Sequence, residues 1–181
     1  MKISKITKIL SILCFFTLTF CSTSQDKRIN RVYYTQFALQ YEKDHYITTN
    51  YRKGFLLPVN SQVEVLKVNK KAIVVRIVSS GMKLNIIHNP KHRTKNINEI
   101  FDELFALTPK DLSKFSTEEK AAITEGKVKE GLRKEAVLVA IGYPPEIKTP
   151  SLSSNDWIYW SSKFNSFKVR FQNNKVVEIK N

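Results

Sequence analysis

The hydrophobic pattern of this chain changes its period near residue 90, and this change limits the folds open to it. Before residue 90, apolar residues alternate with polar ones or form short β-branched and aromatic blocks, which is typical of strands. After residue 96 they recur at steps of three and four, which is typical of helices. The chain therefore combines a strand-rich segment with a helical one, and we expect an α+β fold.

Residues 31–89 are expected to form five short strands. The strands cover Val32–Leu39, His45–Thr49, Val63–Val68, Ala72–Ile77 and Lys83–Ile87. Between the third and fourth strands, Asn69-Lys70-Lys71 predicts a tight hairpin turn. Because so short a strand-rich segment must hide its strand edges, we expect a small all-β barrel over residues 31–89.

Residues 90–125 are expected to form a basic connector and linking helices. The apolar residues of Ile97–Leu107 predict an amphipathic helix. Pro109 suits the first position of the next helical segment. Ser116 and Glu119 then have the spacing of a capping box, which predicts a helix that runs to about Thr124.

Residues 126–181 are expected to form an α+β domain. A helix follows Gly131 and ends at Gly142, where glycine can take a positive φ and the prolines that follow prevent continuation. Three strands come next, at Trp157–Trp160, Phe167–Phe171 and Val176–Ile179. Asn173-Asn174 predicts a hairpin between the last two. We expect the helices to pack on one face of a C-terminal three-stranded antiparallel sheet.

The first 21 residues have the layout of an export signal. A basic segment, Met1–Lys8, precedes the mostly apolar run Ile9–Phe20, which as a helix is too short to cross a bilayer. The end of the run, Leu18-Thr19-Phe20-Cys21, resembles the lipobox of bacterial lipoproteins, although Phe20 stands where that motif usually has a small residue. The resemblance implies acylation of Cys21 and a tether over residues 22–30. The alternative is an ordinary cleaved signal that leaves Cys21 unmodified.

The charge of the chain is strongly basic, with 30 Lys and Arg against 16 Asp and Glu and a formal net charge of +14. Such a charge attracts polyanions. An exported protein meets little nucleic acid, so we expect anionic lipid headgroups and acidic faces of other envelope proteins as partners. The export signal and the lipobox predict a protein that is tethered by lipid in the periplasm.

Two segments of the strand-rich region resemble a known small barrel. Thr48–Gly54 followed by Leu57–Val65 is similar to the entry of a bacterial Src-homology-type β-barrel. The resemblance implies a bend that exposes an aromatic side chain, which makes Tyr51 a candidate contact residue. The alternative is that Tyr51 packs on the barrel wall.

The C-terminal third resembles the SmpA/OmlA (BamE-like) family of small bacterial outer-membrane lipoproteins. The motifs are Gly126, Gly131-Leu132, Ile141-Gly142-Tyr143-Pro144, Trp157-Ile158-Tyr159 and Phe171 to Val176. Leu132 stands where Met is common in that family, and Asn174 where Gly is common. The resemblance implies a BamE-like fold, in which helices pack on the C-terminal three-stranded sheet expected above. It also implies a location at the cell outer membrane, with the lipid-anchored protein facing the periplasm.

The resemblance also implies a non-catalytic envelope lipoprotein that supports outer-membrane protein assembly or envelope integrity through protein and lipid contacts. Candidate contact residues in this third are Tyr143, Trp160, Lys163, Phe164, Lys168 and Arg170. We expect no catalytic residues, no metal site and no cofactor, because the sequence holds no triad motif, zinc motif or phosphate-binding glycine loop. The alternative function is a module that recognises peptidoglycan of the cell wall or inhibits a periplasmic hydrolase.

Overall fold

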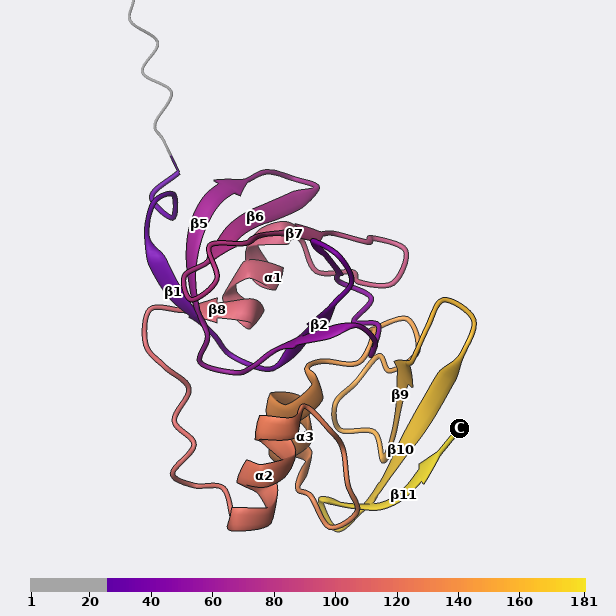
Figure 1. Ribbon diagram of the computed structural model, residues 1–181. Helices are drawn as coiled ribbons and strands as arrows, with labels where there is room; N and C mark the ends of the chain where they lie inside the picture. Colours follow the sequence, from indigo (N-terminus) through magenta and orange to yellow (C-terminus); the bar gives the residue numbers. More distant parts are fainter. Residues whose placement is uncertain (1–25) are drawn as a thin grey trace, which may run out of the picture.

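A computed structural model describes residues 26–181 (Figure 1). The expected signal peptide, the lipobox with Cys21 and the first residues of the expected tether lie outside the described residues. The described chain is α+β, with a mixed six-stranded sheet, three helices and a C-terminal three-stranded antiparallel sheet. Within residues 26–181, no helix combines the length and the apolar composition needed to cross a membrane.

The strand-rich region forms the larger sheet and a separate two-stranded sheet. Its strands are β1 (Val32–Thr35), β2 (Leu39–Tyr41), β3 (His45–Ile47), β4 (Phe55–Leu57), β5 (Gln62–Val68), β6 (Ala72–Ile77) and β7 (Lys83–Ile87). The order in the large sheet is β3-β7-β6-β5-β1-β8, where β8 is Phe105–Ala106, and β2 pairs with β4. The hairpin predicted at residues 69–71 joins β5 to β6, which confirms that turn.

The expected small all-β barrel is wrong, because the sheet is open and does not close into a barrel. Its edge strands, β3 and β8, each pair with one neighbour, and β3 runs parallel to β7. Helix α1 (Ile97–Leu104) lies inside the curve of the sheet (Figure 1). Its Ile100, Phe101 and Leu104 belong to the same buried core as the inward side chains of the strands. A helix that covers the inner face removes the need for the strands to close on themselves.

Helix α1 is shorter than its apolar periodicity predicts. Asn96 and Glu99 form a capping box at its start, and the backbone becomes extended at Phe105. Phe105–Ala106 then forms β8, which pairs with β1. The hydrogen bonds between β8 and β1 satisfy backbone N–H and C=O groups that would otherwise bond to each other within a longer helix. The helical segment expected from Pro109 is also wrong, since residues 107–115 contain no helix.

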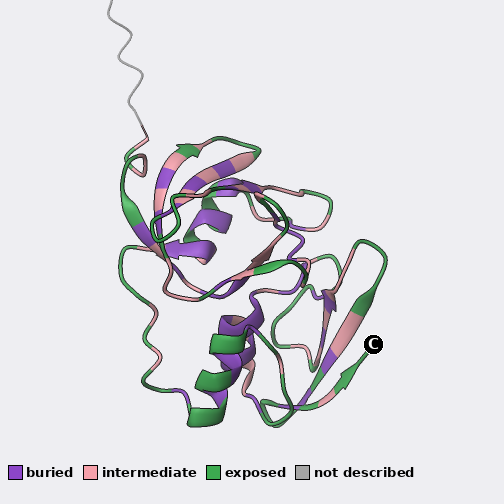
Figure 2. Ribbon diagram, in the orientation of Figure 1, coloured by how far each residue is buried: buried purple, intermediate pink, exposed green. Residues whose placement is uncertain are grey.

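The C-terminal region packs two helices on a three-stranded sheet, as expected. Helices α2 (Thr117–Glu125) and α3 (Lys134–Ile141) precede β9 (Asp156–Trp160), β10 (Ser166–Gln172) and β11 (Lys175–Lys180), and the sheet order is β11-β10-β9. The capping box at Ser116 and the hairpin at Asn173 and Asn174, which both have positive φ, are confirmed. Trp157 and Tyr159 are fully buried against the helices, and Figure 2 shows buried residues where α3 faces the sheet.

Candidate functional site

The two packing units meet along a polar interface that fixes their relative position. The side-chain amide of Asn50 donates to the carbonyls of Ile141 (2.7 Å) and Tyr143 (3.0 Å) at the end of α3. The guanidinium of Arg52 donates to the carbonyls of Ala38 and Gly126, one in each unit. Although Arg52 keeps some exposed surface, burial of its guanidinium lowers its pKa to about 10. The bonds to Ile141, Tyr143 and Gly126 cross from the sheet unit to the helical unit, and a cleft lies beside them.

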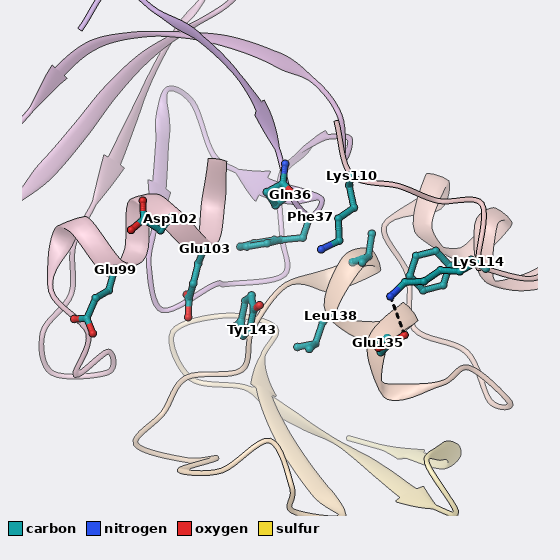
Figure 3. Close-up of a pocket in the computed structure, with 12 residues that line it drawn as sticks. Gln36, Phe37, Glu99, Asp102, Glu103, Lys110, Lys114, Glu135, Leu138 and Tyr143 are labelled. Atoms are coloured by element: carbon teal, nitrogen blue, oxygen red, sulfur yellow. Dashed lines mark ion pairs between the residues drawn. The ribbon is translucent and has the colours of Figure 1, made fainter. Parts of the chain in front are cut away.

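This interface cleft has a volume of 410 Å³, a size typical of small-molecule and peptide sites. Its lining residues are Gln36, Phe37, Glu99, Asp102, Glu103, Lys110, Lys114, Phe115, Glu135, Leu138, Val139 and Tyr143. They come from the segment after β1, from α1, from residues 107–115, and from α3 and the segment after it. Figure 3 shows the acids of α1 on one side, Lys110 and Lys114 on the other, and Phe37 and Tyr143 between them.

Several charged groups of the interface cleft are already paired. Glu103 binds Arg93, whose side chain is only 4% exposed, and also Lys95. On the opposite side, Lys114 lies 3.2 Å from Glu135. Burial, together with the negative charge of Glu103, raises the pKa of Tyr143 above its usual value, so its hydroxyl stays protonated at neutral pH.

A second candidate surface lies around the turn between β9 and β10, and we call it the hairpin surface. It consists of Lys148, Trp160, Lys163 and Phe164, with His92 stacked on the Trp160 ring at a centroid distance of 5.9 Å. Phe164 is 83% exposed, the largest exposure among the large apolar residues of the described chain. Lys163 lies over the Phe164 ring and Lys148 over the Trp160 ring. The surface therefore combines an exposed aromatic ring with two cations.

Lys168 and Arg170 lie on the outer face of β10, where strand alternation placed them. Both are paired: Asp156 lies 3.5 Å from Lys168 and 3.0 Å from Arg170, and Glu178 also contacts Arg170. The hydrogen bond from Arg170 lowers the pKa of Asp156. These two cations are therefore partly neutralised, in contrast to Lys163, which makes no ion pair within the described residues.

The structure brings some of the predicted contact residues together and separates others. Trp160, Lys163 and Phe164 share the hairpin surface, whereas Tyr143 lines the interface cleft. Tyr51 is half-buried in the segment between β3 and β4, next to Arg52, whose backbone N–H donates to the carbonyl of Trp160. Sequence reasoning missed the interface cleft. The one available signal was the spacing of Glu99, Asp102 and Glu103, which places three acids on one face of a helix.

The described residues contain no group of three or more His, Cys, Asp or Glu side chains that could hold a metal ion. Comparison with protein-family models, curated proteins and solved structures finds no match for the chain. The resemblance to the SmpA/OmlA family therefore stays a prediction. The resemblance to the Src-homology-type segment likewise stays a prediction, but the sheet of that region is open and does not form the barrel that it implied.

Proposed function

We propose that this chain is a non-catalytic lipoprotein of the bacterial envelope that supports outer-membrane protein assembly or envelope integrity. In this proposal Cys21 carries the lipid anchor, and the protein faces the periplasm at the outer membrane. The hairpin surface contacts anionic lipid headgroups and neighbouring assembly proteins. The observation that supports the proposal most is Phe164, a fully projecting aromatic side chain at a hairpin tip beside lysine.

The chemistry of the hairpin surface suits the boundary between lipid and water. An aromatic ring gains free energy on leaving water for the acyl boundary, and each lysine near an anionic surface contributes about 1 kcal/mol. Lys148 and Lys163 are both exposed and close to aromatic rings. The outer face of β10, with Lys168 and Arg170, offers a neighbouring surface for an acidic partner protein, which would have to displace Asp156 and Glu178.

The function is tested by purification of the tagged full-length chain from its own cells in detergent, in parallel with a Cys21→Ser variant. We expect outer-membrane assembly proteins, identified by mass spectrometry, to co-purify with the unaltered chain and to be lost with the variant. Recovery of a cell-wall hydrolase or of peptidoglycan fragments alone would contradict the assembly role.

The lipid contact is tested separately with the Cys21→Ser chain and vesicles that contain phosphatidylglycerol. Phe164→Ser should weaken vesicle binding about tenfold, because the variant has no aromatic ring to transfer from water into the lipid. Phe55→Ser is the matched control, since Phe55 is 68% exposed on β4 in the other unit. Equal binding of the Phe164→Ser and Phe55→Ser variants would contradict the assignment of the hairpin surface. The same holds if the Cys21→Ser chain binds vesicles of phosphatidylcholine alone as tightly as vesicles that contain phosphatidylglycerol.

A second candidate function is recognition of the cell wall by the strand-rich unit, which was the alternative expected from the sequence. One observation favours it: Tyr41 and Phe55 pair across β2 and β4, with ring centroids 5.9 Å apart and Phe55 largely exposed. Exposed aromatic rings offer flat apolar surfaces on which sugars can stack. If this function holds, Phe55→Ser should abolish sedimentation with insoluble peptidoglycan and Phe164→Ser should not. The reverse result would exclude this aromatic pair as the contact.

A further inference from the structure

The interface cleft carries opposite charges on its two sides, although the chain as a whole is strongly basic. Glu99, Asp102 and Glu103 project from one face of α1. Lys110 and Lys114 come from the segment between β8 and α2. Figure 3 shows that the two groups are separated by Phe37 and Tyr143. The cleft is therefore bipolar, with an apolar floor between its charged sides.

Three polar groups of the cleft are available to a ligand. Within residues 26–181, Lys110 makes no ion pair, and Figure 3 shows its ammonium directed toward Phe37. Asp102 is exposed and likewise makes no ion pair within those residues. The Tyr143 hydroxyl makes no hydrogen bond to any described residue. Available charge therefore exists on both sides, beyond the groups that pair with each other.

This arrangement disfavours ligands of a single charge. A phosphate or another polyanion would be repelled by the carboxylates of α1, and a simple cation would be repelled by the lysines. A ligand with an amine at one end and a carboxylate at the other meets an opposite charge on each side. Phe37, Leu138 and Val139 add an apolar floor for a side chain between those ends. A short peptide has all three features.

We propose that the interface cleft binds a short zwitterionic peptide. Its amine lies against Asp102 and Glu99, its carboxylate against Lys110, and an apolar side chain lies on Phe37 and Leu138. The proposal goes beyond the envelope function proposed above, which rests on the hairpin surface and involves none of these residues. The occupant is a free short peptide, because the end of a protein chain carries only one terminal charge and the peptide stem of cell-wall material has its N-terminus in an amide bond to the sugar.

The proposal is tested by isothermal titration of the full-length chain in detergent with the tripeptide Ala-Leu-Ala. The same peptide is also titrated with its amine acetylated or its carboxyl amidated. We expect the free peptide to bind and each blocked peptide to bind at least about fivefold more weakly, because each block removes one charge. Absence of binding by the free peptide, or equal affinity for all three peptides, would overturn the proposal.

Charge-reversal variants test which residue binds each end of the peptide. Lys110→Glu should weaken binding of the acetylated peptide, which keeps its carboxylate, and Asp102→Lys should weaken binding of the amidated peptide, which keeps its amine. The charge-matched controls are Lys70→Glu, in the turn between β5 and β6, and Glu130→Lys, which is exposed outside the interface cleft. If the control variants weaken binding as much as the cleft variants, the peptide binds through general electrostatics and the assignment is wrong.

A further arm tests whether a sugar-linked peptide also binds. A purified disaccharide-tetrapeptide from the cell wall is added to the chain with bound Ala-Leu-Ala. We expect it to displace the tripeptide less well than the same tetrapeptide without its sugar, because the amide bond to the sugar removes the N-terminal amine. Stronger displacement by the sugar-linked peptide, or an increase in affinity on Lys110→Glu, would overturn the proposal. Phe164 does not line the interface cleft, so vesicle binding by Phe164→Ser tests the hairpin surface and the peptide titrations test the cleft independently.

Discussion

At the scale of single residues, Glu119 is a buried acid that joins the start of α2 to the start of α3. Its carboxylate accepts hydrogen bonds from Arg133 Nε (2.8 Å) and Nη2 (2.7 Å) and from the backbone N–H of Ser116 (3.0 Å). The hydrogen bonds from Arg133 are the main cause that lowers the pKa of Glu119 to about 2. Glu119 thus both caps α2 and places Arg133 at the beginning of α3.

The lowered pKa makes this contact sensitive to acid. The folded-state pKa lies below the unfolded value of 4.5, so the contribution of Glu119 is fully present above pH 4.5 and is lost as pH falls toward about 2. Glu119→Gln should lower the free energy of unfolding by about 2 kcal/mol at neutral pH and by about half as much at pH about 3. Urea denaturation at both pH values measures the difference. A loss that is the same at both pH values, or an equal effect of Glu130→Gln at an exposed site, would contradict this account.

At the scale of elements, the end of α3 requires glycine for two separate reasons. Gly142 has a φ of +75°, and a Cβ at this position would lie 2.5 Å from the Phe37 ring. The close approach of α3 to the segment after β1 lets the backbone N–H of Ala38 donate to the carbonyl of Val139 (3.0 Å). The helix end therefore forms part of the contact between the two units.

This glycine can be compared with a glycine in open space. Gly81 has a φ of +71°, and no atom of the described residues lies within 4 Å of the position its Cβ would take. Gly81→Ala should cost about 1 kcal/mol of unfolding free energy from backbone strain. Gly142→Ala should cost roughly 3 kcal/mol, because its backbone (φ +75°, ψ −170°) is in a region essentially restricted to glycine and Phe37 must also move. Thermal or urea denaturation gives both values. Equal losses would mean that neither the backbone conformation nor the contact with Phe37 adds a cost at Gly142.

At the scale of the whole molecule, two hydrophobic cores are linked by the side chains of Asn50 and Arg52. One core lies between the six-stranded sheet and α1, and the other between α2, α3 and the C-terminal sheet. Both tryptophans of the chain, Trp157 and Trp160, are in the second unit. Tryptophan fluorescence therefore reports on the second unit, whereas far-ultraviolet circular dichroism reports on both.

The polar interface should make the two units unfold together. We expect the fluorescence and dichroism transitions of the unaltered chain to coincide. Arg52→Met removes the bonds to Ala38 and Gly126, so it should lower stability by about 2 kcal/mol and separate the two transitions. Lys53→Met is the control, because Lys53 is exposed and, among residues 26–181, pairs with Glu42 alone. Coincident transitions in the Arg52 variant would show that apolar contacts alone hold the units together.

The sequence alone determined most of the secondary structure and the α+β class, because these depend on local periodicity, capping and turn residues. The capping box at Ser116, the turn at Asn173 and Asn174, and the outward positions of Lys168 and Arg170 are local or alternating features of this kind.

Only the tertiary structure decided that the strands form an open sheet around α1, since closure depends on which distant segment covers the inner face. It also decided that α1 ends at Leu104, because Phe105 pairs with Thr35 at the free edge of β1. The interface cleft has the same origin, because its two sides come from segments that are separated in the sequence and meet only when both cores have formed.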